Sequence, residues 1–303
     1  VMYDQDLKPV GIRRELNEQE LMEHELHLAN KLYSLGYLLH RYKNPARPWA
    51  VWAMDHKIAD EGESHGGSGK SLAYLALTQF MPSDQVIKYS EVINGRKPKL
   101  TEDSHIFGNV TEHTDLVIVN DVDQYLNFQF FFEPLTGVMS CNPKHTTATT
   151  LPFNKSPKFA FTSNFAVRKA DPSTLRRLLY TVFSDYYHHG PNDDYEEALS
   201  PEIEFGKNLW SDFDDHEWNL FFNTMARATQ LYLGLDLPIA APSENIKRRT
   251  LKAAMGEEFK QWADVYFNPQ NDKLDKCLVK EDVKKAYVDE TGIKINVTTQ
   301  RLT

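Results

Sequence analysis

The chain has 303 residues, of which 41% are hydrophobic and 25% are charged, and its formal net charge is −9. This composition is ordinary for a globular protein, and the length allows one large domain plus smaller ones. A protein that coats duplex DNA over a broad face is usually basic, so the acidic balance confines any nucleic-acid contact to a local site.

The sequence lacks signals for membrane insertion and secretion. No run of about 18 apolar residues occurs, so neither a transmembrane helix nor a membrane partner is expected. The N-terminus has no charged-then-apolar signal. The two cysteines, Cys141 and Cys277, lie far apart. They suggest neither a zinc cluster nor a disulfide framework, which fits a reducing cytoplasm. The chain begins at Val1 instead of Met, as a fragment of something longer would.

Residues 14–42 have the pattern of amphipathic helix. Leucines recur at helical spacing with charged residues between them, at Leu21, Leu28, Leu32, Leu35 and Leu39. We expect one long or two short helices that pack either on the core or on a neighbouring subunit. Pro45 and Pro48 end the segment, so residues 1–48 form a predicted helical N-terminal segment, with oligomerisation as its further predicted role.

A predicted strand at residues 49–54 leads into a stretch typical of a phosphate-binding loop. From residue 64 it reads Ser-His-Gly-Gly-Ser-Gly-Lys-Ser. Closely spaced glycines let backbone N–H groups cradle phosphate oxygens, and the helix predicted at 72–80 would start beside them. The lysine would place its ammonium on the β and γ phosphates, and the last serine would complete a Mg²⁺ shell. The predicted nucleotide-binding residues are Gly66, Gly67, Ser68, Gly69, Lys70 and Ser71.

Residues 116–119 form an apolar, β-branched run that is typical of a buried parallel strand. The run ends in Asn120-Asp121-Val122-Asp123. A carboxylate that ends a strand beside a phosphate loop holds Mg²⁺ or its waters, or orients the attacking water. Asp121 is therefore the predicted acid and, with Ser71, a predicted metal ligand.

Two further segments follow in the order that an α/β fold requires. Residues 137–153 predict a β-hairpin with a polar tip, and residues 159–163 predict a second apolar strand that ends at Asn164. A helix start at Asp171 precedes Arg176-Arg177 and the apolar residues 178–183. Strands that alternate with helices imply a parallel sheet covered on both faces, with active residues at the carboxyl ends of the strands.

The order and compact spacing of these motifs over residues 50–190 resemble the superfamily 3 helicases, AAA+ type ATPases of phage, plasmid and small-virus replication proteins. The helicase part of phage and plasmid primase–helicases is most similar. The resemblance implies an α/β fold with an AAA+ type P-loop core, a parallel sheet flanked by helices. It implies ATP hydrolysis with Mg²⁺, a homo-oligomeric ring, expected to be hexameric, and translocation on single-stranded DNA. It also implies a bacterial host cytoplasm, a phage or mobile-element origin and a primase domain or protein as a partner.

The resemblance also assigns roles to residues. Asp121 matches the acid of the Walker B motif, and Asn164 matches the polar sensor at the end of its strand. Arg177 best matches the arginine finger supplied to the next subunit's ATP, with Arg176 as the nearby alternative. On the residues alone, both arginines could equally be cations on a helix surface.

Lys144 and His145 fall where such helicases carry a DNA-gripping hairpin in the central pore, although a Lys-His pair on a polar loop is often only solvated. Two positions depart from the family pattern: Ser64 stands where glycine is usual, and Asn120 where a second acid is frequent. Because an amide cannot act as a base, we expect that Asp123 or another carboxylate orients the water, or that turnover is slow.

The remaining chain divides into two predicted regions. Residues 191–245 combine an acidic stretch, interpreted as a solvated loop in preference to a metal site, with a helical lid region that includes a helix at 216–233. Residues 246–303 are predicted to be helical and then to form part of a winged-helix-like module. The leading hypothesis is a DNA helicase. The alternatives are an ATP-dependent DNA-loading or packaging factor and a P-loop ATPase without a nucleic-acid partner.

Overall fold

The computed structural model describes residues 16–56, 67–167, 171–184, 186–187, 200–242, 257–271, 273 and 276–292, and also the backbone of the short strand pair β1 (Met2–Tyr3) and β2 (Pro9–Val10). Its centre is a five-stranded parallel sheet with the order β4-β5-β8-β3-β9. The strands are β3 (Ala50–Asp55), β4 (Ser90–Asn94), β5 (Leu116–Val122), β8 (Lys158–Ser163) and β9 (Leu178–Phe183). The predicted fold class, an α/β protein with a parallel sheet flanked by helices, is confirmed.

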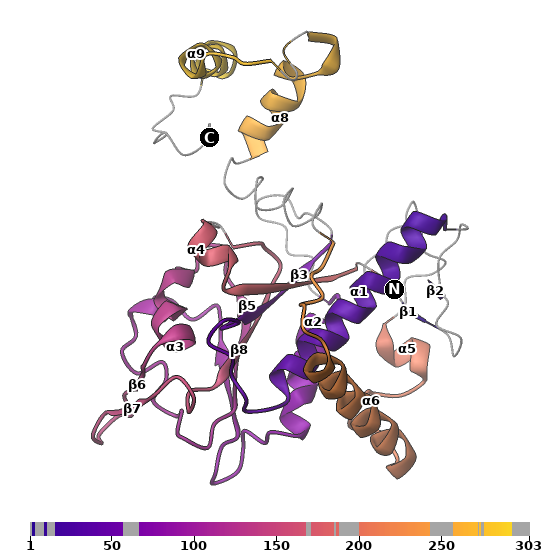
Figure 1. Ribbon diagram of the computed structural model, residues 1–303, viewed down its shortest axis with the longest axis vertical. Helices are drawn as coiled ribbons and strands as arrows, with labels where there is room; N and C mark the ends of the chain where they lie inside the picture. The colour runs from indigo at the N-terminus through magenta and orange to yellow at the C-terminus, as the bar shows by residue number, and fades with distance from the viewer. Residues whose placement is uncertain are drawn as a thin grey trace.

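Helices and turns connect these strands, and Figure 1 labels the longer ones. The α-helices are α1 (Glu18–Leu38), α2 (Lys70–Leu75), α3 (Phe132–Thr136), α4 (Pro172–Leu175), α5 (Pro201–Phe205), α6 (Asp215–Gly234), α8 (Glu257–Tyr266) and α9 (Lys280–Thr291). The 3-10 helices are η1 (Ala76–Gln79), η2 (Leu100–Glu102), η3 (Phe128–Phe131) and η4 (Pro269–Asn271). The predicted hairpin is confirmed as β6 (Met139–Cys141) paired with β7 (Thr149–Leu151).

The sheet is buried on both faces because its strands are apolar at nearly every position. Successive side chains of a strand point to opposite faces, so Trp52 and Met54 join one hydrophobic cluster while Val51 and Ala53 join another. The first cluster includes the phenylalanines of η3, and the second includes aromatic residues of α1, α2 and α6. Figure 1 shows the corresponding layers, with α3 and the β6–β7 hairpin on one side of the sheet and α1, α2 and α6 on the other.

Helices α1 and α6 pack closely against each other. Each begins with a capping box, formed by Asn17 with Glu20 and by Asp214 with Glu217. At Gly36 the two backbones approach so closely that a Cβ atom would lie 2.0 Å from the carbonyl oxygen of Ala228. The amphipathic stretch of residues 14–42 therefore forms one helix, α1, which follows the β1–β2 strand pair. Its carboxyl half packs on the core, although Leu21, Met22 and Leu26 near its start stay exposed.

Three local predictions differ from the structure. The helix after the phosphate loop begins at Lys70 and becomes a 3-10 helix at Ala76. Strand β4 is not among the predicted strands, because an edge strand with polar residues lacks a clear pattern. Helix α4 ends at Leu175, before both arginines, and the apolar residues that follow form β9. A short apolar run does not distinguish a buried strand from a helix.

The C-terminal helices form a small cluster of their own. Phe259 and Trp262 of α8 pack against Val283 and Tyr287 of α9. The residues of the predicted winged-helix-like strand, 294–297, lie outside the described residues, as does most of the acidic stretch before α5. Within the described ranges, no group of three His, Cys, Asp or Glu residues could hold a metal ion. No helix there is long and apolar enough to cross a bilayer.

Because α1 and α6 approach so closely at Gly36, an alanine at this position should destabilise the protein. Gly36→Ala should lower the free energy of unfolding by about 1–3 kcal/mol, because the added methyl group overpacks the backbone of α6. Gly234→Ala at the end of α6 is the matched control, since its Cβ would meet no atom within 4 Å. That variant should keep or slightly raise stability, because alanine favours helix. Urea unfolding followed by circular dichroism measures both, and equal stability of the two variants would contradict the packing described for α1 and α6.

Candidate functional site

A pocket of about 360 Å³ lies at the carboxyl edge of the sheet, where β5 and β8 end and α2 begins. Most of its lining comes from the loop before α2, α2 itself and the ends of β5 and β8, with Arg96 and Pro201 at its rim. The lining residues are Gly67, Ser68, Gly69, Lys70, Ser71, Leu72, Arg96, Asn120, Asp121, Thr162, Ser163, Asn164 and Pro201. The parallel sheet thus brings together most of the residues that the sequence predicts for nucleotide binding.

The loop before α2 has the backbone that a phosphate cradle requires. Gly67 and Gly69 have φ angles of 102° and 86°, in the left-handed region that glycine adopts without strain. Gly69 also caps α2, which starts at Lys70. Of the predicted loop residues, Gly66 lies outside the described residues, as does Ser64.

Lys70 is buried, with only 6% of its surface exposed, and within the described part of the chain the side chains of Asp55, Ser68 and Asn164 lie around its ammonium. It forms an ion pair with Asp55 and lies 2.9 Å from Ser68 Oγ and 3.1 Å from Asn164 Oδ1. Asp55 is the last residue of β3 and is 5% exposed. Sequence reasoning missed Asp55, although a carboxylate that ends the strand before a phosphate loop was a usable signal. The lysine is therefore already oriented toward the pocket by β3 and β8.

Asp121 lies in an irregular part of β5. Its φ of 59° is left-handed, and the register between β5 and β8 shifts between Val119 and Val122. Thr162 of β8 fixes this bulge, since its Oγ1 accepts the N–H of Asp121 at 2.8 Å and donates to Asn120 Oδ1 at 2.9 Å. The bulge turns the carboxylate of Asp121 into the pocket, while Asn120 is bound to the neighbouring strand.

Arg96 is a second cation in the pocket that sequence reasoning missed. Its guanidinium binds Asp121 through two atom pairs, Nε to Oδ2 at 2.6 Å and Nη2 to Oδ1 at 3.1 Å. This hydrogen bonding raises the pKa of Arg96 above its ordinary value. No local sequence pattern marks Arg96, because it reaches the pocket only through the pairing of β4 with β5.

The pocket suits a magnesium ion and phosphates. Ser71 and Asp121 line the same space and supply a hydroxyl and a carboxylate. Mg²⁺ prefers oxygen ligands and usually binds through one or two protein groups, with waters and phosphates completing its shell. The donor set therefore fits the predicted metal site.

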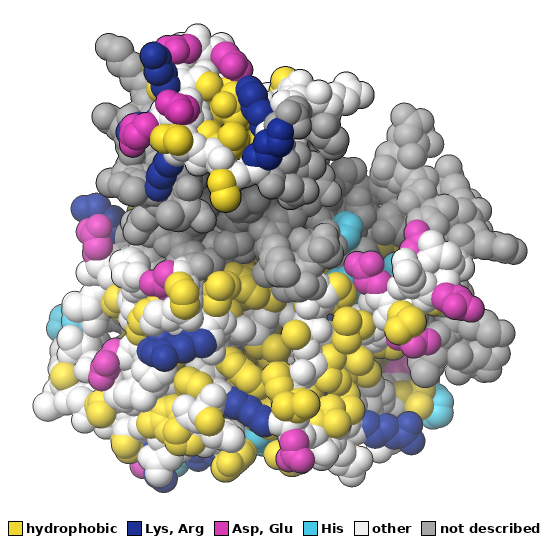
Figure 2. All heavy atoms as spheres, turned by 45° about the horizontal axis from the view of Figure 1, so that its top comes forward, with side chains coloured by type: hydrophobic (Ala, Val, Ile, Leu, Met, Phe, Trp, Pro, Cys, Tyr) yellow, Lys and Arg dark blue, Asp and Glu magenta, His cyan; other side chains and the backbone are white. Residues whose placement is uncertain are grey.

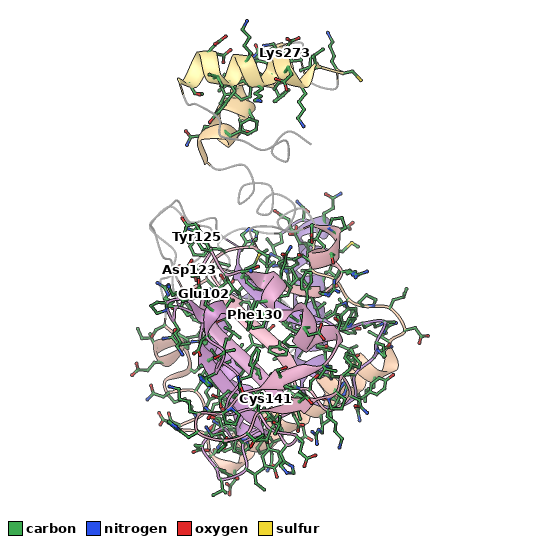
Figure 3. All side chains as sticks on the ribbon, turned by 90° about the vertical axis from the view of Figure 1, so that its left-hand side faces the viewer. Glu102, Asp123, Tyr125, Phe130, Cys141 and Lys273 are labelled. Carbon is green, nitrogen blue, oxygen red and sulfur yellow. The ribbon has the colours of Figure 1, made fainter. Side chains whose placement is uncertain are left out.

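Asp123, by contrast, lies apart from the pocket lining. It is exposed, and its Oδ1 accepts the backbone N–H of Tyr125 at 2.7 Å in the turn after β5. Figure 3 shows Asp123 and Tyr125 at the end of the core away from Cys141, the last residue of β6. Asp121 is the one carboxylate among the lining residues that the structure describes.

Arg177 lies at the opposite edge of the sheet from Lys70. Its carbonyl accepts the N–H of Ala50 at the start of β3, whereas Lys70 follows the end of that strand. Arg177 is 9% exposed, and its guanidinium donates to both oxygens of Ser173 and stacks 4.2 Å from the centre of the Phe132 ring. Burial lowers the pKa of Arg177. Arg176 beside it is exposed to solvent.

Lys144 and His145 form the tip of the β6–β7 hairpin, as predicted. Residues 144–150 are all exposed, and His145 has a left-handed φ of 65° that closes the turn. The hairpin projects from one side of the core in Figure 1. On the face shown in Figure 2, Lys and Arg side chains lie in separate small groups, not in one continuous basic surface.

No protein-family model matches the chain, and no curated protein matches it. Among similar solved structures are two A-form apo structures of the NrS-1 C-terminal region, with 14% and 13% identity, TM-scores of 0.43 and 0.47, and 94% and 92% of this chain covered. A third is the JCV helicase bound to an acetamide compound, with 12% identity, a TM-score of 0.33 and 80% of this chain covered. The chain spans 64%, 63% and 62% of these structures' own chains, less than two thirds of each.

The buried ion pair predicts a stability effect. Asp55→Asn should lower the free energy of unfolding by about 3 kcal/mol, because it leaves the charge of Lys70 buried without its counter-ion. The double variant Asp55→Asn, Lys70→Met should be more stable than Asp55→Asn alone, since neither charge remains. Urea unfolding at pH 7 in phosphate-free buffer compares them. A double variant no more stable than Asp55→Asn would show that the pair is not buried as described.

Proposed function

We propose that the chain is an ATP-dependent DNA helicase of a phage or plasmid-type replication system, which couples ATP hydrolysis to translocation on single-stranded DNA. We further propose that it acts as a homo-oligomeric, hexameric ring in the bacterial cytoplasm, with a primase domain or protein as a partner. The observation that carries the proposal is the meeting of Lys70, Ser71, Asp121 and Asn164 in one pocket. Two strands, β5 and β8, and the glycine loop with the start of α2 assemble that set, and its lysine, serine and aspartate are the groups that hold phosphates and Mg²⁺ in P-loop NTPases.

Each residue of the pocket has a defined task in this proposal. Lys70 holds the β and γ phosphates, and Asn164, at 3.1 Å from its ammonium, keeps it oriented. Ser71 and Asp121 hold Mg²⁺, which when bound supplies positive charge to the phosphate oxygens. Asp121 is the one carboxylate in the described lining, and Asn120 cannot accept a proton from water. We therefore expect slow turnover.

The ring proposal needs a cation that one subunit offers to the next. Arg177, the predicted finger, is buried and bound to Ser173 and Phe132, whereas Arg176 is exposed at the same edge of the sheet. We propose that Arg176 is the finger and that Arg177 positions the chain around it. Both lie away from the pocket of their own subunit, as a contribution in trans requires.

The second candidate function is an ATP-dependent DNA-loading or packaging factor that switches its assembly without processive unwinding. Asp121 as the one carboxylate in the described lining also favours this function. It implies slow ATP hydrolysis, and a slowly hydrolysing site can act as a switch. Strand separation of a forked duplex distinguishes the two. A helicase unwinds it in proportion to the ATP hydrolysed, whereas a loading factor binds the fork and leaves it paired.

Lys70 and Asp121 are both expected to be essential for ATP hydrolysis. Lys70→Ala should abolish nucleotide binding or turnover, because it removes the charge that holds the phosphates. Asp121→Ala should keep nucleotide binding and stop hydrolysis, because the metal ligand is lost. Phosphate release measures turnover, and a fluorescent ATP analogue measures binding. Hydrolysis by Lys70→Ala at the normal rate would refute the assignment of this pocket.

The tip of the β6–β7 hairpin is expected to contact single-stranded DNA. Lys144→Ala should weaken binding to single-stranded DNA, because the net charge of −9 leaves no broad basic face to replace the hairpin tip. The slope of log K against log salt should become shallower by about 0.7 for each subunit that contacts the strand. Lys155→Ala, an exposed lysine beyond β7, is the control and should behave as the wild type. Undiminished binding and unwinding by Lys144→Ala would remove the hairpin from the DNA site.

The active site is expected to be completed between two subunits. Lys70→Ala should be inactive because the phosphates are no longer held. Arg176→Ala should be inactive because a trans arginine contributes on the order of 10³ to 10⁵ in rate. Mixed in equal amounts, they should recover part of the activity, since some interfaces join an intact Lys70 to an intact Arg176. If activity recovers when Lys70→Ala is mixed with Arg177→Ala instead of Arg176→Ala, Arg177 is the arginine finger. If neither mixture recovers activity although subunits exchange, the shared site is refuted.

A further inference from the structure

The acid that would hold the metal ion already has a partner in this chain. Asp121 binds the guanidinium of Arg96 through both carboxylate oxygens, at 2.6 and 3.1 Å. Lys70, the other charged residue in the proposed reaction, is likewise paired with Asp55. The two cations that line the pocket are therefore each paired with a carboxylate, Lys70 with the buried Asp55 and Arg96 with Asp121, and a phosphate in the pocket would compete for both cations.

The backbone places Arg96 at this position with little freedom. Gly95 donates its N–H to the carbonyl of Asn120 at 2.6 Å, directly against the bulge of β5. A Cβ at residue 95 would lie 2.7 Å from Cα of Val122 and 2.8 Å from the carbonyl oxygen of Asn120, so only glycine allows this approach. The N–H of Arg96 is held by Asn94 Oδ1 at 3.0 Å. The loop after β4 is thus fixed to the segment that carries Asp121.

The side chains of this pair, by contrast, can exchange partners. Arg96 is 53% exposed and Asp121 is 44% exposed. An ion pair with this exposure contributes little to stability, so a fold of this kind does not depend on it. Guanidinium offers a planar fork that binds carboxylate and phosphate with the same bidentate geometry. Arg96 also lines the pocket together with Lys70 and Ser71.

We infer that Arg96 is a second phosphate-binding cation, supplied by the same subunit, which exchanges Asp121 for the terminal phosphate of a nucleoside triphosphate. The inference rests on the proposed function, since it requires Asp121 to turn to the metal ion when nucleotide binds. The guanidinium then loses its carboxylate, and the phosphates are the anions that share its pocket. Ser71 and Asp121 would hold Mg²⁺ for the terminal phosphates of a nucleotide, so Arg96, which binds Asp121, would lie beside the terminal phosphate. Arg96 therefore favours ATP over ADP.

Nucleotide affinity, measured without hydrolysis, tests this inference. Fluorescent ADP and a fluorescent non-hydrolysable ATP analogue are titrated with Mg²⁺ against the full chain. Arg96→Ala should bind the ATP analogue about tenfold or more weakly, because hydrogen bonds between charged groups are lost. Its affinity for ADP should change by less than about threefold. Arg96→Lys keeps the charge without the fork and should lie between Arg96→Ala and the wild type, and it serves as the test if Arg96→Ala does not fold.

Lys97→Ala is the matched control. Lys97 is the next residue, is also 53% exposed and is paired with Asp103, which does not line the pocket. Its substitution should leave both affinities unchanged. Suppose that the wild type binds nucleotide and that Lys70→Ala does not. Unchanged affinities of Arg96→Ala, or an equal loss of affinity for ATP and ADP, would then overturn the inference. Tighter ATP binding by Arg96→Ala would also overturn it, because Arg96 would then only hold Asp121 away from the nucleotide. If instead the wild type binds neither nucleotide, or Lys70→Ala binds as tightly as the wild type, the proposed function itself fails.

Discussion

The position of β8 between β3 and β5 is the constraint on which the site depends. Parallel pairing on both sides of β8 aligns the carboxyl ends of three strands that are far apart in the sequence. Asn164 then lies within 3.1 Å of Lys70, and Thr162 holds the bulge that carries Asp121. The same strand contributes Phe159 and Phe161 to the aromatic core beneath the pocket. The groups that would meet a nucleotide are thus placed by the most buried strands of the molecule, which gives them a rigid support.

The electrostatics of the pocket follow from this arrangement. A lysine as deeply buried as Lys70 needs a counter-ion, and Asp55 provides it from the end of the strand that leads into the loop. Arg96 and Asp121 repeat the same pairing at the solvent side of the pocket, where both are half-exposed. Each of the two cations that line the pocket is therefore held by a carboxylate.

Much of this site could be predicted from the sequence, because its strands have local signatures. The apolar runs of β3, β5 and β8 and the glycine loop indicated where Lys70, Asp121 and Asn164 would meet. What could not be predicted depends on contacts between distant segments. Arg96 reaches the pocket only because Gly95 is held against β5, and β4 is too polar to be recognised as a strand. The burial of Arg177 is set by Phe132, a residue far away in the sequence. Neighbouring arginines of one sequence motif therefore have opposite exposures.

The left-handed backbone of Asp121 has a consequence for how this site can vary among related chains. At a φ of 59°, glycine, asparagine and aspartate are accommodated with little strain, whereas longer or β-branched residues are not. Glutamate could supply the same charge, but the left-handed backbone of the bulge would oppose it. Of glycine, asparagine and aspartate, only aspartate also supplies the carboxylate that binds Arg96. Sequences with glutamate here should be expected to have a regular β5, and with it a different path for the loop that carries Arg96.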